Sequence, residues 1–520
     1  MKYLALLLLV PILTLVPILT QAQPAAVKAS QEWIAKEGHN ILKSYAEVLR
    51  IPNHASDSIN IRKNAVLLDG MFQKRGFNMR VLQLPGAPPV VYGEKNVPGA
   101  QRTLCFYVHY DGQPVDPEKW TNDPFDPVLY NEALFNGGKR IAYPKAGDKI
   151  DPNWRIYARS TSDDKAPLIS LAAALDALDA SDIAVTSNIK LFFDGEEESS
   201  SPNLVDYLQT YSELFDDISV WLLCDGSVFQ TGQPQLKFGG RGITGMELTV
   251  YGATRPLHSG HYGNWAPVPG QMLARLLTSM KADDGTVLIE GFYDSVDPVS
   301  DFEAEQIAKI PNIESFLRQD LGLLQTEGMG ETVFERLLKP TLTVRGLASG
   351  NVGKKARNII PTTATATLGM RLVKGNDPEK MLNLVEAHIR KEGWHIVYDE
   401  PDTETRLRYP KIVKVERDPD GYPAGKGAMD DPAILPIINA TRSYVGDDLV
   451  LLPSSGGSNK MYYVIYNVLN KPAISVNIAN FDNNQHAADE NMKISNLWYG
   501  VELYSVFLTM PPDEELMIDR

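Results

Sequence analysis

The stretch TLCFYVHYD (residues 103–111) decides the fold class, because an almost continuous apolar run ends directly in a histidine and a carboxylate. Such a run is typical of a strand that is buried on both faces of a sheet. We predict five strands of this kind: Thr103–Val108, Arg155–Ala158, Ile189–Phe193, Val220–Cys224 and Ala473–Ile478. Helical patterns such as Pro167–Leu178 and Leu204–Leu214 lie between them. This alternation predicts an α/β fold with a mostly parallel sheet.

A different pattern begins near Arg241. Residues Thr244–Tyr251 alternate between apolar and polar, as in a strand with one exposed face. More strands (Pro340–Val344, Thr363–Val373, Trp394–Tyr398) and two helices (Gly270–Met280, Pro378–Lys391) follow. We therefore expect a catalytic domain in two parts, residues 23–240 and 421–520, around an inserted α+β domain, residues 241–420. Residues 281–340 are expected as an insertion within that smaller domain, and 418–430 as the return linker.

Composition narrows the class of protein. The chain has 520 residues, 43% of them hydrophobic, and a net charge of -15. Its sequence pI is near 5.1, so nucleic acid is not an expected partner. Only two cysteines are present, Cys105 and Cys224, which excludes a disulfide framework and a four-cysteine zinc module. Both lie in apolar runs, and we predict buried thiols.

The first residues resemble an export signal. Lys2 precedes the apolar run Tyr3–Leu19, and Thr20-Gln21-Ala22 ends in a small residue. These features predict a signal peptide, residues 1–22, cleaved after Ala22. A membrane anchor is the alternative, but the run is short and contains two prolines. We expect a periplasmic or secreted protein with no stable membrane span.

Charged residues collect where the predicted strands end. They are His109 and Asp111, Asp163, Glu196–Glu198, Asp225 and His486. Ligands in open α/β sheets bind at the carboxyl ends of strands, and imidazole with carboxylate suits zinc, manganese or cobalt. Each piece alone is more often a surface or structural group. Together they predict two divalent ions that clamp a water and polarise a carbonyl, which requires a shared carboxylate and an unligated one as base.

Local spacing suggests different roles for some of these residues. Glu197 and Glu198 are adjacent, and in an extended segment their side chains would point in different directions. One could then bind metal while the other faces the water. Asp111 lies two residues after His109 and is well placed to orient its imidazole.

Several motifs together resemble the di-zinc metallopeptidase family of carnosinases, carboxypeptidase G and aminoacylases. The motifs occur in the family's order, from about residue 30 to the C-terminus: Tyr107–Asp111, Ser162–Lys165, Glu196–Ser199, Asp225, Leu257–Gly260 and His486. The resemblance implies that His109 and Asp225 bind one metal. It implies that Glu198 and His486 bind the other and that Asp163 bridges the two. Glu197 would be the general base, with Asp111 as the companion of His109.

The same resemblance gives the smaller domain a role. It would be a lid that carries the contacts of a homodimer, and His258 would reach the partner's active site to stabilise the oxyanion. Asn358 and Arg371 match positions that hold the substrate carboxylate, and Gly457 and Ser458 match a turn at the same end. Four glycines of the family's motifs are replaced here, by Ala158, Ser160, Ala166 and Ser200. We expect the local backbone to differ there.

The leading hypothesis is an exported di-metal hydrolase that cleaves dipeptides or short peptides with a free C-terminal carboxylate. An N-acyl amino acid deacylase would use the same site and is the second hypothesis. A catalytically silent binding protein is the third, and the presence of Glu197 argues against it.

Overall fold

The apolar runs of the sequence form the middle of an eight-stranded sheet, in a computed structural model that describes residues 22–328 and 330–511. The strand order is β1-β2-β7-β3-β8-β20-β9-β19. The strands are β1 (Asn78–Leu82), β2 (Val90–Lys95), β7 (Asn188–Asp194), β3 (Thr103–His109), β8 (Val220–Leu223), β20 (Ala473–Val476), β9 (Gln235–Lys237) and β19 (Val450–Leu452). The central strands β7, β3, β8 and β20 run parallel, so the predicted α/β fold is confirmed.

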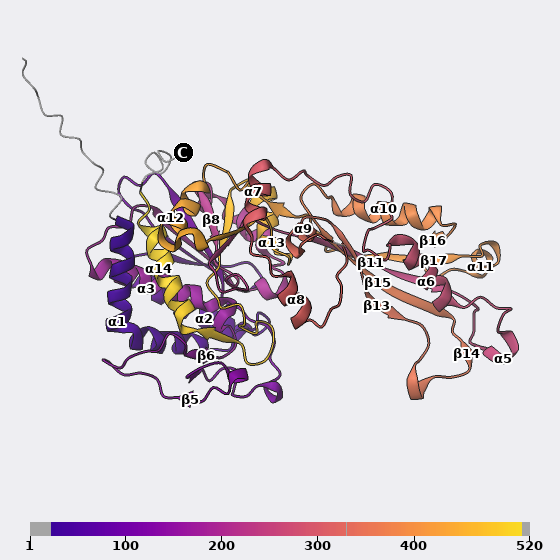
Figure 1. Cartoon of the computed structure of the whole chain (residues 1–520), viewed down its shortest axis with the longest axis horizontal. Coiled ribbons are helices and arrows are strands. Elements are labelled where there is room, and N and C mark those ends of the chain that lie inside the picture. The colour runs from indigo at the N-terminus through magenta and orange to yellow at the C-terminus, as the bar shows by residue number, and fades with distance from the viewer. Residues whose placement is uncertain (1–21, 329, 512–520) are drawn as a thin grey trace, which may run out of the picture.

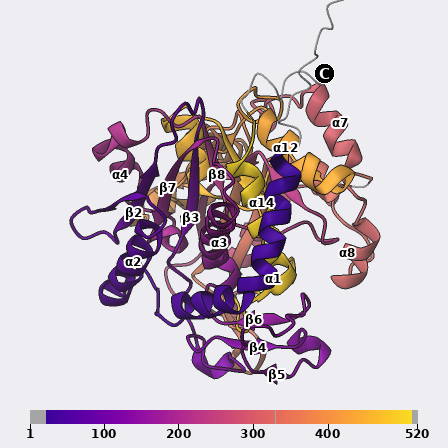
Figure 2. The ribbon, with the colours of Figure 1, turned by 90° about the vertical axis from the view of Figure 1, so that its left-hand side faces the viewer.

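Both faces of this sheet are buried, which explains the continuous apolar runs. Along β3, Leu104, Phe106 and Val108 face one core, whereas Cys105 and Tyr107 face the other. The first core lies under five helices: α1 (Ala22–Leu49), α2 (Ser58–Gln73), α3 (Ala166–Ala180), α12 (Leu435–Val445) and α14 (Ile494–Leu508). Figure 2 shows α1, α3 and α14 packed together on that side. The second core lies under α4 (Leu204–Thr210) and α13 (Lys460–Tyr463).

One predicted strand of the large sheet is elsewhere. Strand β6 (Arg155–Tyr157) lies in a separate four-stranded antiparallel sheet, in the order β21-β6-β4-β5. Its partners are β21 (Asn491–Lys493) and β4 (Val128–Tyr130), and β5 (Arg140–Ile141) completes the sheet. The prediction was wrong because a short apolar run does not show which sheet supplies its hydrogen-bond partners. The loop after β6 therefore reaches the site from a second sheet.

The smaller part of the molecule lies to the right in Figure 1, beyond the large sheet. Its five-stranded sheet has the order β13-β15-β11-β17-β16, antiparallel except for the pair β16 and β17. The strands are β13 (Thr341–Ala348), β15 (Thr363–Leu372), β11 (Gly242–Tyr251), β17 (Ile412–Arg417) and β16 (His395–Val397). Helices α6 (Pro269–Met280) and α10 (Pro378–Lys391) cover one face. The sequence prediction had missed β17.

Part of the expected insertion at 281–340 packs on the large domain instead of the small one. Helix α7 (Asp301–Lys309) contacts β19, and α8 (Glu314–Asp320) and α9 (Val333–Leu337) follow it. A separate apolar cluster fixes them there, formed by Phe229, Ile313, Val450 and Leu452, with Phe334 packed against it. These contacts are long-range in sequence, so the position of the segment could not be read from its own pattern.

The two connections between the domains run side by side. Strand β10 (Gly239–Gly240) leaves the large domain and pairs antiparallel with β18 (Gly425–Lys426) on the way back. A Cβ atom at Gly425 would lie 2.2 Å from the backbone carbonyl carbon of Tyr462, so only glycine fits this crossing.

The N-terminal prediction concerns residues that are mostly outside the described chain. Residues 1–21 are not described, and Ala22 is the first residue of α1. Within the described residues, the helices are too short or too polar to span a bilayer. Cys105 and Cys224 are buried free thiols, as predicted.

Candidate active site

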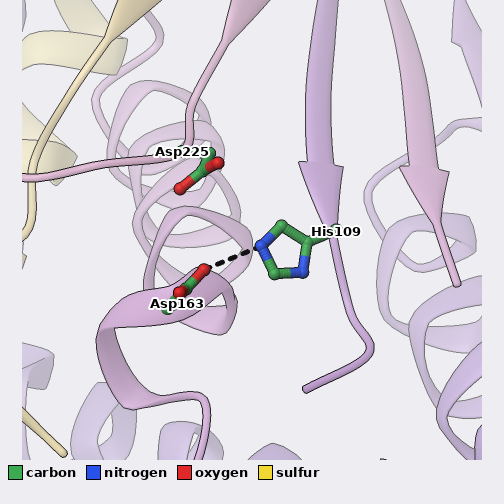
Figure 3. A group of neighbouring side chains, drawn as sticks. All are labelled: His109, Asp163 and Asp225. Carbon is green, nitrogen blue, oxygen red and sulfur yellow. Dashed lines mark hydrogen bonds and ion pairs between the residues drawn. The ribbon is translucent and has the colours of Figure 1, made fainter. Parts of the chain in front are cut away.

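Three residues from three different elements form the first group of possible metal ligands. His109 ends β3, Asp163 follows β6, and Asp225 follows β8, as Figure 3 shows. The Nε2 atom of His109 lies 2.8 Å from Oδ1 of Asp163. One ligand atom from each of the three residues lies within 4.8 Å of the others, close enough to share one cation.

A second group shares Asp163 with the first. The other carboxylate oxygen of Asp163, Oδ2, lies 3.0 Å from Nε2 of His486. The same imidazole nitrogen lies 3.2 Å from Oε2 of Glu198. Asp163 therefore presents one oxygen to each group, which is the arrangement that a carboxylate bridging two ions requires.

Asp111 connects the first group to the Glu197 turn. One of its oxygens lies 3.3 Å from Nδ1 of His109. Its two oxygens also accept hydrogen bonds from the backbone N–H groups of Glu197 and Glu198, at 3.0 and 3.1 Å. Residues Glu197–Ser199 form a single 3₁₀ turn, so the expected extended segment was wrong. Asp111 fixes this turn beside the imidazole.

Glu490 is an important residue that the sequence analysis missed. It is fully buried and accepts hydrogen bonds from Arg159, from both the backbone and hydroxyl of Ser162, and from the backbone N–H groups of Ser160 and Asp163. It therefore holds the loop that presents Asp163. In the sequence, only its position four residues after His486 could have indicated that Glu490 lies near the site.

Two of the replaced glycine positions have a backbone conformation that favours glycine. Ser160 has a φ of 61° and Ser200 a φ of 66°, both in the left-handed region that favours glycine. Serine therefore adopts at these two turns the left-handed conformation that glycine adopts most easily. At Ala166 the backbone is ordinary right-handed helix, where glycine has no advantage.

Carboxylates outnumber the imidazoles in the site. Burial and neighbouring carboxylates raise the pKa of Glu198 to about 7 and raise the pKa values of Glu197 and Asp225. A hydrogen bond to Asp163 raises the pKa of His486 to about 9. No lysine or arginine of the described chain forms an ion pair with these carboxylates. Two imidazoles and a crowd of carboxylates at these distances fit two divalent cations.

Three of the predicted substrate-binding residues lie together near Glu197. The Arg371 guanidinium donates a hydrogen bond to the Ser458 hydroxyl, and the backbone N–H of Arg241 donates to the carbonyl of Gly457 at 3.1 Å. Asn459, which the sequence analysis missed, lies with its Nδ2 atom 3.5 Å from Oε1 of Glu197. One turn therefore connects the arginine with the glutamate. Gln113 was also missed, and its amide donates to Glu198 at 2.7 Å.

The other two predicted residues lie apart from this group. His258 ends β12 (Leu257–His258), which pairs with β14 (Ile359–Ile360), and the carbonyl of Asn358 accepts a hydrogen bond from the backbone N–H of Ser259 at 3.0 Å. This pair belongs to the far end of the small domain, where Figure 1 places β14 and α5 (Ser259–Tyr262). Within one chain, His258 therefore does not join the ligand groups.

Comparisons with known proteins identify the family of this chain. The model of peptidase family M20/M25/M40 matches residues 105–510. The Cys-Gly metallodipeptidase dug1 of Schizosaccharomyces pombe is 24% identical over 81% of this chain and 82% of its own. The human Beta-Ala-His dipeptidase is 22% identical over 93% of this chain and 90% of its own.

A solved structure extends the likeness to the whole fold. The M20 family metallo-carboxypeptidase Sso-CP2 of Sulfolobus solfataricus superposes with a TM-score of 0.71 and 27% identity, over 90% of this chain and 98% of that one. The family match covers well over half of the sequence, and the predicted resemblance is confirmed. The chain therefore belongs to peptidase family M20/M25/M40 and is a metallopeptidase.

Proposed function

We propose that this protein is a di-metal dipeptidase that cleaves dipeptides or short peptides with a free C-terminal carboxylate. The observation that carries the proposal is the pair of ligand groups that share Asp163, with Glu197 on the turn beside them. Two relatives named as dipeptidases, one for Cys-Gly and one for Beta-Ala-His, support this substrate class. Zinc is the proposed metal, with manganese and cobalt as alternatives.

The proposed roles follow from position. His109 and Asp225 would hold one ion, Glu198 and His486 would hold the other, and Asp163 would contribute to both sites. When bound, the two ions polarise the scissile carbonyl and make a water more acidic. Glu197 takes the proton of the attacking water and delivers it to the leaving amine. Asp111 holds the Glu197 turn and the His109 ring in place.

The substrate carboxylate is proposed to bind Arg371. A guanidinium can clamp a carboxylate with two parallel hydrogen bonds, and the described chain supplies no acidic partner in an ion pair with Arg371. Gly457 and Ser458 add polar groups to the same end. The distance from this end to Glu197 is short because Asn459 directly follows Ser458.

Residues 241–420 are proposed to act as the lid and dimerisation domain between the two parts of the catalytic domain. His258 and Asn358 would then complete the active site of the partner, since neither joins the ligand groups of its own chain. Export is proposed from the first 22 residues alone. N-terminal sequencing of the mature protein would test it, with Gln23 as the expected first residue.

A substrate panel tests the proposed activity. Metal-reconstituted protein is assayed on dipeptides and on N-acyl amino acids, with C-terminal amides as controls. Faster hydrolysis of free-acid dipeptides supports the proposal. Exclusive turnover of N-acyl amino acids would make the protein a deacylase, and turnover of neither class would refute both functions.

Subunit mixing tests the role of His258. Glu197→Gln and His258→Ala should each be nearly inactive. When the two variants are mixed as subunits, about half of the dimers are mixed and each holds one complete site, so activity should return to roughly a quarter of wild type. If His258 serves its own chain, mixing restores nothing. A monomer in light scattering would also refute the proposal.

A further inference from the structure

Arg241 lies where the outgoing connection enters the small domain, between β10 and β11. Its backbone pairs with the substrate-binding turn of the large domain. The N–H of Arg241 donates to the carbonyl of Gly457 at 3.1 Å, and a parallel bridge joins Arg241 to Ser458. The hydroxyl of the same Ser458 accepts a hydrogen bond from Arg371. Two arginines therefore contact one turn.

The two arginines also share a face of the small sheet. Arg371 of β15 is paired with Ile243 of β11 on one side and with Thr341 of β13 on the other. Successive side chains along a strand point to opposite faces, so Arg241, two residues before Ile243, falls on the face of Arg371. The residues on either side of Arg371 are buried in the small-domain core, and the two arginines consequently lie on the face away from α6 and α10.

The guanidinium of Arg241 reaches across the end of β15. Its Nη2 atom donates to the carbonyl of Lys339 at 2.7 Å. Lys339 lies two residues before Thr341, the partner of Arg371 on β13. The side chain of Arg241 thus connects the start of β13 with the backbone that holds the Gly457 turn.

This guanidinium is buried without an anion. Arg241 is 4% exposed, and its Nε atom has no hydrogen-bond partner among the described residues. Across residues 22–328 and 330–511, it forms no ion pair with an aspartate or glutamate. Burial and the charge of Arg371 lower the pKa of Arg241 to about 10, so the group is still protonated at neutral pH. A buried cation beside a second cation is unfavourable until an anion compensates both.

We propose that Arg241 is a positioning residue that supplies a second positive charge to the carboxylate-binding end, beside Arg371. The proposal rests on the proposed function, because it needs a substrate with a free carboxyl group. Arg371 makes the hydrogen bonds to the carboxylate, whereas Arg241 acts by its charge and through the turn that both arginines contact. A terminal amide is neutral and compensates neither cation. Arg241 would therefore increase the preference for free-acid over amidated substrates.

Two substitutions separate the charge of Arg241 from its hydrogen bond. Arg241→Gln keeps an N–H donor for Lys339 and loses the charge, whereas Arg241→Lys keeps the charge. We expect Arg241→Gln to raise KM for a free-acid dipeptide about tenfold with kcat nearly unchanged, the order for two charges in a partly buried site with some salt screening. For the matching dipeptide amide, KM should change less than about twofold. Arg241→Lys should keep KM for the acid within about threefold of wild type.

Lys426→Met is the matched control. Lys426 belongs to β18 at the same crossing, and its Nζ atom lies 2.7 Å from Oε1 of Glu303 on α7. The substitution removes a positive charge and weakens the crossing, but the ion pair that it breaks does not involve the substrate-binding turn. The acid-to-amide preference should stay near wild type. A loss of preference as large as in Arg241→Gln would overturn the proposal, because any weakening of the crossing would then have this effect.

The kinetics of the Arg241 variants decide the remaining outcomes. Equal losses on acid and amide in Arg241→Gln would overturn the proposal, since a structural defect affects both substrates. An Arg241→Lys variant as poor as Arg241→Gln on the acid would refute the role of the charge. Wild-type KM values for both substrates in Arg241→Gln would refute it as well.

Binding separates this proposal from the proposed function. Calorimetry measures the Kd of the dipeptide acid and of its amide for metal-loaded Glu197→Gln protein, with and without Arg241→Gln. If wild type proves inactive on peptides but the acid-to-amide preference falls about tenfold with Arg241→Gln, the carboxylate site stands and the proposed reaction fails. An unchanged preference refutes the role of Arg241 whatever the reaction is.

Discussion

Two groups of buried acidic side chains in this molecule differ in their partners and in the direction in which their pKa values are shifted. In the small domain, Glu386 of α10 is 2% exposed and accepts hydrogen bonds from Arg390, Tyr398 and Arg417, at 2.8 to 2.9 Å. Burial alone would raise the pKa of Glu386, but Arg417, Tyr398 and Arg390 outweigh it and lower the pKa. At the large sheet, the carboxylates of Glu197, Glu198 and Asp225 have raised pKa values and lack such partners.

The difference shows which cluster is complete within the protein. A buried carboxylate that has cationic partners contributes to the folded state by itself, whereas one without them needs a cation from outside or must take up a proton. In the small domain, Glu386 already has its cationic partners within the protein. Under the proposed function, metal ions complete the cluster at the large sheet, so the following changes should affect the two clusters very differently.

Metal removal should have the largest effect. Chelation is expected to reduce hydrolysis to background, and added zinc, manganese or cobalt should restore it, because the proposed reaction needs the ions that the groups around Asp163 would hold. Hydrogen exchange of α10 should not change, since Glu386 keeps its own partners. Full activity in protein verified to be metal-free would show that the comparison is mistaken.

Variants of the two adjacent glutamates should distinguish proton transfer from metal binding. Glu197→Gln cannot accept a proton and should lower turnover at least about 10²-fold, with metal content near wild type. Glu198→Gln should lower metal content, because it removes a ligand that lies 3.2 Å from His486. Metal analysis and kinetics on both variants measure this. The reverse pattern would exchange the roles assigned to the two residues.

The grouping of the candidate ligands could be predicted from the sequence because strand ends bring distant residues together. His109 and Asp225 directly follow buried strands, and parallel strands end at one edge of a sheet. Glu490 could not be found in this way. It works through backbone N–H groups of a loop, and such contacts leave no local pattern in the sequence.

In the fold, too, local patterns predicted the elements themselves but not their packing partners. Runs buried on both sides predicted the central strands well, and α10 has the bounds that its periodicity gave, Pro378–Lys391. The prediction failed for β6, whose short run belongs to another sheet, and for α7, which leaves the small domain to cover β19. Both failures concern the partner of an element, which depends on residues far away in the chain.

Glu490→Gln should weaken metal binding without removing a ligand. The amide places an N–H₂ group against the backbone donors of one carboxylate oxygen, either Ser160 at Oε2 or Ser162 and Asp163 at Oε1, so the loop that presents Asp163 should shift. We expect a loss of about 10- to 100-fold in metal affinity, as for other groups that orient ligands. Competition with a chelator measures it. Asp482→Asn is the control, because Asp482 pairs with Arg155 in the adjoining sheet and is 40% exposed. Equal losses in both variants would contradict the role of Glu490.

Glu386→Gln should have the smallest effect on activity and a measurable one on stability. We expect the small domain to lose about 2 kcal/mol, the range for hydrogen bonds to charged groups, with metal content unchanged. Hydrogen exchange of the α10 amides measures the loss. Glu379→Gln is the matched control, because Glu379 pairs with the same Arg417 but is 71% exposed, and about 0.5 kcal/mol or less is expected there.

The pH dependence gives this last prediction its sign. The pKa of Glu386 is lowered from its ordinary 4.5 in the folded protein, so its contribution to stability is fully present above that value. As the pH falls through the lowered folded pKa, the side chain takes up a proton and the contribution is lost. The stability difference between wild type and Glu386→Gln should therefore be constant from neutral pH down to about pH 5 and shrink below it. A difference that grows on acidification would mean that Arg390 and Arg417 do not stabilise the charged form, and the contrast between the two clusters would disappear.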